Sequence, residues 1–315
     1  MIPALIIVFV LLLICIVISF ICFRMAFYVS EKQRQESMRI LTPRGAIYDP
    51  YRARMEEWAL EARKMPHRIV RIKSFDGLTL SGRFYEYAPG APIEIMFHGY
   101  RGTAERDMSG GVQRCWSLKR SALIVDQRGA SLSGGRVITF GIKESRDARS
   151  WVDFVIKDQG EEAKIILTGI SMGATTVMIA AGRPLPKQVV CVIADCGFNS
   201  AKDIITKVIN DMHLPGKALY PFVKLGARLF GGFNPDETSA EEALKNCSVP
   251  VFLIHGEADD FVPCEMSRKL LKVCSSPAFL FTVPGAGHGM GYLTDTLGYV
   301  EKLKAFSKEN GIDIG

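Results

Sequence analysis

The feature that most constrains this chain is an alternation, between residues 67 and 310, of short apolar runs with longer amphipathic runs. Short apolar runs bounded by turn residues are typical of buried strands, and apolar positions three or four residues apart are typical of helices. When the two alternate, the strands form a mostly parallel sheet covered by helices on both faces. The strand-like runs occupy residues 67–75, 78–87, 93–99, 121–129, 163–171, 188–195, 249–256 and 278–285.

The first two strand-like runs differ from the others because only a short turn separates them. They flank Asp76-Gly77, a dipeptide that is typical of hairpin turns. We therefore predict the α/β class: a doubly wound, mostly parallel sheet with an antiparallel N-terminal hairpin at its edge.

The alternation stops at about residues 199–247, where helical runs occur without a convincing strand. This segment is predicted to be a small helical insert, or cap, before the strand-like run at 249–256. Such an insert would lie above the carboxyl ends of the strands, where sheets of this kind bind ligands. Its apolar side chains could line an acyl pocket, or could equally be ordinary helix faces packed on the sheet; they include Ile204, Val208, Met212, Leu214, Leu219, Tyr220 and Phe222.

Residues 2–23 form an apolar run without a charged side chain. A helix of roughly 20 apolar residues is long enough to cross a bilayer. A cleaved signal peptide is the alternative, but it would need a basic segment before a shorter apolar core and a small-residue cleavage site, and neither is visible. We expect the run to be an uncleaved anchor that contacts the lipid bilayer.

Basic residues follow this run, beginning with Arg24 and Lys32, and none precedes it. Because positive charge favours the cytoplasmic side, we expect a single-pass protein of the cell membrane with its large C-terminal part in the cytoplasm. The predicted organisation is an anchor at 1–23, a connector at 24–66 with a short amphipathic helix at 51–65, and a globular domain at 67–315.

The composition argues against several classes of function. The formal net charge is only +6, and no Lys/Arg-rich block or nucleic-acid motif appears, so we expect no nucleic-acid partner. The eight cysteines lack C-x-x-C spacing, so we expect reduced thiols and no structural zinc. The glycine-rich segments match neither a phosphate loop nor a dinucleotide motif. No cofactor or metal is therefore expected.

Ser171 stands in a G-x-S-x-G pattern between a strand-like run and a helical run. A serine on so tight a strand-to-helix turn needs small neighbours, and Gly169 and Gly173 provide them. The helix that follows also favours negative charge at its N-terminus. An ordinary serine-containing turn is the alternative, because short motifs often match by chance. We predict that Ser171 is a nucleophile.

A serine nucleophile needs a base and an acid. His288 is the histidine that lies both in a loop and after a candidate acid, so we predict that it is the base. Asp259 and Asp260 both follow the strand-like run that ends at Gly256, and we choose Asp259 because it comes first. Asp195 is a weaker candidate for the acid, and we expect it to cap the turn that follows it.

The chain order Ser171, Asp259, His288 is that of α/β-hydrolase triads. With the segments around these residues, the region from about Ile69 to Glu309 resembles the α/β-hydrolase superfamily. It is most similar to the branch that groups serine aminopeptidase-like, prolyl-oligopeptidase-like and Bem46-like membrane-anchored hydrolases. The matching segments are residues 97–102, 125–135, 139–155, 169–174, 194–198, 254–263 and 285–289.

The resemblance implies an oxyanion hole formed by the backbone amides of Met172 and Tyr100. His98 and Gly99 would shape the turn that carries Tyr100. Asp126 and Arg128 resemble a family loop near the site, and we interpret them as a structural ion pair or turn, since buried charges normally occur in pairs.

The predicted function is a serine hydrolase that cleaves a carboxylic ester, with an acyl or lipid-like substrate as one option. A serine peptidase is the alternative, and it would require an acidic cluster that holds a substrate amine. The sequence does not show whether Asp236, Glu241 or Glu242 could form one. A non-catalytic, membrane-tethered interaction protein is the second alternative, but such proteins usually lack a triad member and all three candidates are present here.

Overall fold

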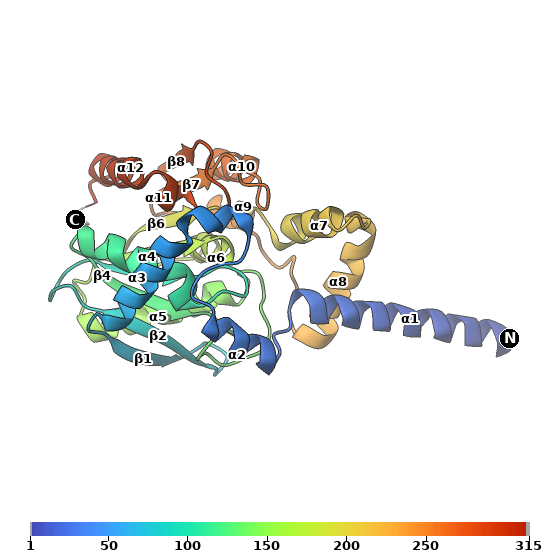
Figure 1. The fold of residues 1–315 in the computed structure, drawn as a ribbon. Helices are drawn as coiled ribbons and strands as arrows, with labels where there is room; N and C mark the ends of the chain where they lie inside the picture. The colour runs from blue at the N-terminus through green and yellow to red at the C-terminus, as the bar shows by residue number, and fades with distance from the viewer. Residues whose placement is uncertain (1, 313–315) are drawn as a thin grey trace.

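The computed structural model of the protein describes residues 2–312. Within this range, eight strands form one sheet in the order β1-β2-β4-β3-β5-β6-β7-β8 (Figure 1). β1 pairs antiparallel with β2, and β2 with β4, while every later pairing is parallel. The predicted parallel sheet with a hairpin at its edge is therefore confirmed. The strands are β1 (Arg68–Lys73), β2 (Thr79–Tyr85), β3 (Ile93–Phe97), β4 (Ser121–Asp126), β5 (Ile165–Ile170), β6 (Val189–Asp195), β7 (Val251–Gly256) and β8 (Ala278–Val283).

Helices cover both faces of the sheet because alternate side chains of each strand point to opposite faces. In β3, Ile95 and Phe97 join one core cluster, and Met96 joins another. The helices that pack around the sheet are α4 (Ala104–Ser117), α5 (Glu144–Gln159), α6 (Met172–Ala181), α10 (Glu265–Val273), α11 (Gly291–Thr294) and α12 (Thr296–Glu309). α5 and α6 contribute to the cluster of Phe97, whereas α4 and α12 contribute to clusters on the opposite face.

The connector folds against the domain. It contains α2 (Glu31–Arg39), the 3-10 helix η1 (Ala46–Tyr51) and α3 (Arg52–Lys64). α3 corresponds to the amphipathic helix expected at 51–65, and its Trp58 is buried. Trp58 packs closely against α4 because Gly110 has no side chain there: a Cβ would lie 2.7 Å from the indole ring.

The insert is helical, as expected. It contains α7 (Ala201–Asp211), α8 (Gly216–Gly231) and α9 (Ala240–Leu244), and no strand occurs in the described residues between β6 and β7. α7 and α8 project from the carboxyl-terminal side of the sheet, toward the side on which the N-terminal helix extends (Figure 1).

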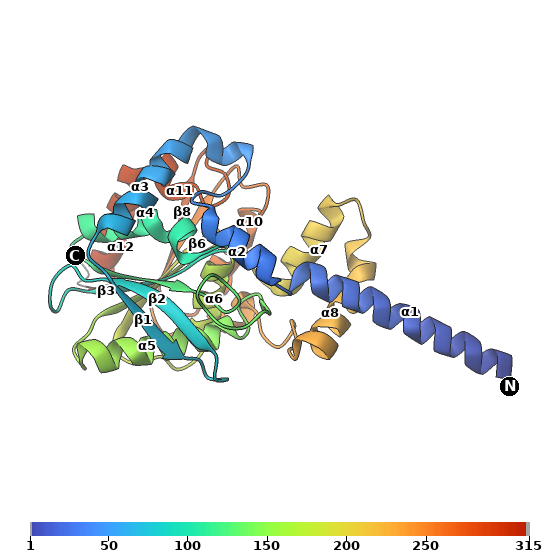
Figure 2. The same ribbon diagram turned by 60° about the horizontal axis from the view of Figure 1, so that its bottom comes forward.

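The N-terminal helix α1 (Ile2–Ala26) extends away from the domain, as Figure 2 shows. It is long and apolar enough to cross a membrane, a property that it shares with signal sequences and with buried core helices. Only Ser19 and Phe23 of α1 are buried. The carboxyl-terminal end of α1 packs against the insert, where the rings of Phe20 and Phe230 lie 5.1 Å apart.

Candidate active site

Ser171 lies at the turn between β5 and α6 with a left-handed backbone, φ +55°. A non-glycine residue seldom adopts this conformation unless the surrounding structure holds it. The two flanking glycines permit the necessary packing. A Cβ on Gly173 would collide with the carbonyl oxygen of Phe97, and a Cβ on Gly169 would collide with the backbone of Gly173. Both glycines are therefore required by backbone contacts.

His288 lies in the loop between β8 and α11, and its side chain reaches Ser171. The distance from His288 Nε2 to Ser171 Oγ is 3.0 Å. The carbonyl oxygen of His288 accepts a 3.3 Å hydrogen bond from the hydroxyl of Tyr48, which belongs to η1. The ring of Phe261 packs edge-on against the imidazole, with centroids 5.0 Å apart. The histidine loop is thus fixed from the connector as well as from the domain.

Asp259 lies in the loop after β7 and contacts the other imidazole nitrogen. Its Oδ2 is 2.8 Å from His288 Nδ1, and its Oδ1 accepts hydrogen bonds from the amides of Phe261 and Val262. Burial opposes ionisation of Asp259, but the hydrogen bonds of His255 and His288 outweigh it and lower its pKa to about 2. The carboxylate is therefore ionised at neutral pH.

Asp260, the alternative acid, is exposed. Its backbone oxygen accepts a hydrogen bond from Lys207. The two neighbouring aspartates therefore have different surroundings, and Asp259 is the one that lies beside His288.

The loop after β3 lies opposite the serine. A Cβ on Gly99 would be 3.5 Å from the Cβ of Ser171, so the loop backbone passes close to the hydroxyl-bearing residue. Tyr100 follows Gly99, and its side chain turns away to donate a 2.8 Å hydrogen bond to the carbonyl oxygen of Ala26. Met172 is the first residue of α6, so its amide lacks a partner within the helix. The two predicted oxyanion donors thus belong to segments that flank Ser171.

His98 is buried and holds the loop in shape. The amide of Gln127 donates to His98 Nε2 at 2.9 Å, so Nε2 is unprotonated and Nδ1–H donates to the carbonyl of Gly99 at 2.8 Å. Burial lowers the pKa of His98, which keeps the ring neutral. Both ring nitrogens are thus used in supporting the turn.

Arg128 is paired, but not with Asp126. Its guanidinium contacts the carboxylates of Asp147 and Asp76, while Asp126 Oδ1 accepts a hydrogen bond from the amide of Ala104. Arg128 lies in a turn, as one of the two expected interpretations has it; the other, a direct ion pair between Asp126 and Arg128, is not formed.

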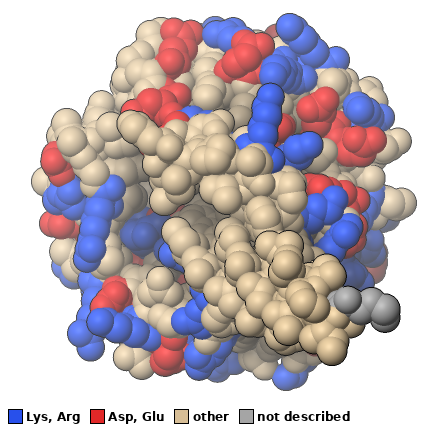
Figure 3. Space-filling model, turned by 90° about the vertical axis from the view of Figure 1, so that its right-hand side faces the viewer, with Lys and Arg blue, Asp and Glu red and all other residues tan. Residues whose placement is uncertain are grey.

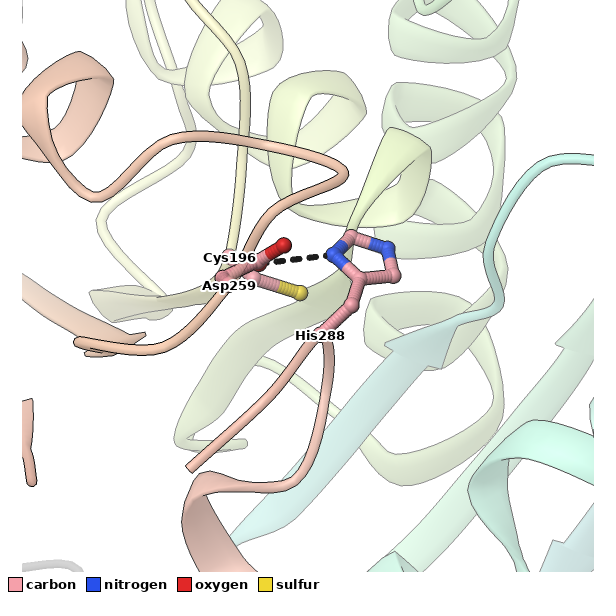
Figure 4. Close-up of side chains that lie close together, drawn as sticks. All are labelled: Cys196, Asp259 and His288. Atoms are coloured by element: carbon pink, nitrogen blue, oxygen red, sulfur yellow. Dashed lines mark hydrogen bonds and ion pairs between the residues drawn. The ribbon is translucent and has the colours of Figure 1, made fainter. Parts of the chain in front are cut away.

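Cys196, which follows β6, lies beside the acid and the base. Figure 4 shows its thiol next to Asp259 and His288, and the potential ligand atoms of the three residues lie within 4.8 Å of one another. A metal here would compete with the hydrogen bonds that occupy both imidazole nitrogens. It would also need a thiolate, and burial raises the pKa of Cys196 well above its usual value. These contacts favour proton transfer over metal binding.

A cavity of about 230 Å³ opens beside Ser171 and His288. No residue of the insert (199–247) lines it, so the alternative in which the insert forms the acyl pocket does not describe this cavity. Most of its wall is apolar or aromatic and comes from the connector, β3, α4 and the C-terminal helices: Pro43, Tyr48, Met55, Trp58, Met96, Met108, Tyr292, Leu293 and Tyr299.

The connector residues of this wall are the part of the site that sequence reasoning missed. Met55 and Trp58 lie three residues apart on α3, and both face the cavity. The apolar face of α3 predicted that this helix packs on the domain. The spacing of its apolar residues does not show whether they pack into a hydrophobic core or line a cavity.

Asp195 lies at the end of β6 and lines the same cavity. Its Oδ1 has no hydrogen-bond partner among the described residues, and its carboxylate caps no turn in residues 2–312, so the predicted capping role is wrong. Burial raises the pKa of Asp195 to about 6, against the attraction of His255 and His288. The cavity therefore contains a polar position close to the serine.

Comparison with known families identifies one that covers the second half of the chain. The model of the prolyl oligopeptidase family matches residues 139–311, which is more than half of the 315 residues. This range includes Ser171, Asp259 and His288.

Individual relatives extend the similarity toward the N-terminus. YqkD of Bacillus subtilis is 26% identical over 187 residues, which cover 59% of this chain and 61% of YqkD. YfhR of Escherichia coli is 26% identical over 279 residues, which cover 86% of each protein. The protein bem46 of Schizosaccharomyces pombe is 23% identical over 255 residues, or 79% of each.

Solved structures share the fold. The Pyrococcus furiosus esterase Pf2001 superposes with a TM-score of 0.65 at 23% identity, over 79% of this chain and 93% of the esterase. A puromycin-hydrolyzing peptidase of Mycobacterium tuberculosis superposes with a TM-score of 0.59 at 15% identity, over 80% of this chain and 40% of the peptidase. The same architecture is thus found in an esterase and in a peptidase.

We expect Asp195→Asn to stabilise the protein at neutral pH. The raised pKa means that the unfolded chain releases this proton near pH 4, whereas the folded protein retains it to about pH 6. Folding of the wild type therefore becomes less favourable as pH rises through this window, by up to about 3 kcal/mol. The measurement is unfolding of the detergent-solubilised full chain between pH 4 and 7. The advantage of the variant should grow with pH, Asp260→Asn should show no such trend, and a constant difference would contradict the assignment.

Proposed function

This chain belongs to the prolyl oligopeptidase family, and we propose that it is a membrane-anchored serine hydrolase that cleaves a carboxylic ester. It is a hydrolase of the α/β-hydrolase fold. The ester specificity, the roles of individual residues and the anchoring by α1 are the proposed parts.

One observation carries the proposal: a hydrogen-bonded sequence of serine, imidazole and carboxylate. The Ser171–His288 and His288–Asp259 distances are 3.0 and 2.8 Å. This arrangement meets the geometric requirement for an activated nucleophile with an oriented base.

In the proposed reaction, His288 Nε2 takes the proton of Ser171 as the serine oxygen attacks the substrate carbonyl carbon. Asp259 keeps Nδ1 protonated and stabilises the imidazolium. The oxyanion accepts hydrogen bonds from the amides of Tyr100 and Met172, and loss of one such donor typically costs roughly 3 kcal/mol. His288 then protonates the leaving alcohol, and water repeats the attack on the acyl-enzyme.

The cavity supports an ester with a compact apolar group. A cavity of about 150 Å³ can hold benzene in another protein, and the cavity beside Ser171 has about 230 Å³. Its aromatic and methionine walls suit an aryl or medium-length acyl group.

A peptidase is the second candidate, and Asp195 is the observation that favours it. Asp195 lines the cavity, and its Oδ1, which has no hydrogen-bond partner among residues 2–312, could accept a hydrogen bond from a substrate amine. The acidic residues considered from the sequence, Asp236, Glu241 and Glu242, do not line the cavity. Asp236 is instead paired with Lys224.

We expect wild-type protein to react with a fluorophosphonate probe and Ser171→Ala to lose this labelling, because the probe reacts with an activated serine. Ser150→Ala, on α5, is the matched control and should be labelled like the wild type. In-gel fluorescence of the purified full chain provides the measurement. Unlabelled wild type, or labelled Ser171→Ala, would instead favour the non-catalytic alternative.

Asp259→Asn and Asp260→Asn test which aspartate orients the base. Loss of the carboxylate beside His288 Nδ1 should lower kcat for p-nitrophenyl butyrate by about 10⁴. Without it, nothing keeps the imidazole in the tautomer with the proton on Nδ1, and nothing stabilises the imidazolium that forms in the reaction. Asp260→Asn should remain within about threefold of the wild type, as expected for an exposed side chain. Equal losses in both variants, with unchanged circular dichroism, would reject this assignment.

A substrate panel separates ester cleavage from peptide cleavage. We expect higher kcat/KM for p-nitrophenyl butyrate to octanoate than for alanyl and leucyl p-nitroanilides, because the cavity wall is largely apolar. Asp195→Asn provides the control: an amine-binding role predicts a selective loss of nitroanilide hydrolysis. Efficient nitroanilide hydrolysis that disappears in Asp195→Asn would establish the peptidase candidate instead.

A further inference from the structure

An apolar stripe, largely exposed, runs along α8. Ala218, Phe222, Leu225 and Leu229 recur at spacings of four, three and four residues, which places them on one side of the helix; Phe222 is half-buried and the other three are exposed. Leu225 is 37% exposed and Leu229 is 56% exposed. The stripe has no partner among the described residues that covers these two side chains.

The opposite side of α8 already faces the protein core. Tyr220, Val223 and Ala227 are buried and belong to the main hydrophobic cluster. The stripe is therefore a second apolar surface, on the side that points away from the domain. An apolar outer side of a helix is unfavourable in water, so it indicates contact with another apolar surface.

The corner between α7 and α8 extends this surface. Met212 and Leu214 are 51% and 46% exposed. Together with the stripe they form what we call the insert surface: Met212, Leu214, Ala218, Phe222, Leu225 and Leu229.

The insert surface is continuous with α1. Phe230, one residue beyond the stripe, packs against Phe20. α8 and α1 approach closely because Gly226 has no side chain: a Cβ there would collide with the carbonyl oxygen of Ser19. In both ribbon views α8 crosses the carboxyl-terminal end of α1 (Figures 1 and 2). A bilayer that contained α1 would therefore meet α8 lying across its surface.

The charges near the insert surface fit the same partner. Lys217 and Arg228 are exposed on the flank of the stripe away from α1, and Arg24 follows the apolar run of α1. Figure 3 shows the face from which α1 projects: uncharged surface extends from the helix, and both basic and acidic side chains lie around it. An apolar stripe with a basic flank is typical of helices that lie in the plane of a membrane interface.

We propose that the insert surface rests on the lipid bilayer beside the point at which α1 enters it. This inference depends on the proposed anchoring by α1 and adds a second, lateral membrane contact made by the catalytic domain. It assigns the exposed side of the insert to lipid.

The same contact brings the candidate active site to the membrane surface. The carbonyl oxygens of Met25 and Ala26, at the end of α1, accept hydrogen bonds from Arg101 and Tyr100. These two residues belong to the loop that carries a proposed oxyanion donor. Esters that partition into the bilayer interface would thus be concentrated where the reaction takes place.

The test uses the full chain in vesicles of phosphatidylcholine and phosphatidylglycerol, with and without bromine on the acyl chains, because bromine quenches nearby tryptophan. Three variants each add one tryptophan: Leu229→Trp on α8, Leu297→Trp on α12 and Phe9→Trp on α1. Leu297 is 85% exposed and is the matched control. Emission of the wild-type chain in the same vesicles is subtracted.

We expect brominated lipid to remove more than half of the added emission in Leu229→Trp and Phe9→Trp, and less than a tenth in Leu297→Trp. Quenching of Phe9→Trp but not of Leu229→Trp would overturn the lateral contact and leave the anchor intact. Lack of quenching in Phe9→Trp would reject the anchor itself. A blue-shifted but unquenched Leu229→Trp would indicate that a second protein copy covers the stripe, which also overturns the inference.

Discussion

The left-handed backbone of Ser171 is the constraint on which the rest of the site depends. Such a conformation costs on the order of 1–3 kcal/mol and survives only where packing enforces it. Here the amide of Ser171 donates to the carbonyl of Asp195 at 2.8 Å, and Gly173 lies against the end of β3. Three parallel strands therefore hold the serine, and the same strands set the positions of the loops that carry the other polar groups.

The end of β3 also links this turn to the N-terminal helix. Its loop passes Ser171 at Gly99, and the next residue, Tyr100, hydrogen-bonds the last turn of α1. The ring of Phe140 packs on both Tyr100 and Phe27, with centroids 5.2 and 5.6 Å away. A shift of α1 would therefore move groups beside the serine, so α1 is coupled to the loop that flanks Ser171.

Local signals in the sequence were sufficient for the fold and for the serine turn. Strand and helix periodicity, and the glycine spacing around Ser171, are patterns that can be recognised among residues close along the chain. The partners of Arg128 were not predicted, and the role of Asp195 was mispredicted, because both are set by distant segments: Asp76 and Asp147 for Arg128, and the cavity wall for Asp195. The wall made by Met55 and Trp58 was missed for the same reason, since its other side comes from helices more than forty residues away.

The insert and the connector contribute to different surfaces of the protein. The insert carries exposed apolar side chains and contributes nothing to the cavity, whereas the connector carries Met55 and Trp58 into it. Substrate selection in the proposed enzyme would therefore depend on the segment that joins α1 to the domain, and membrane contact on α8. Because Tyr48 of η1 hydrogen-bonds the His288 loop and the end of α1 accepts a hydrogen bond from Tyr100, the loops on both sides of the serine are held by the N-terminal part of the chain.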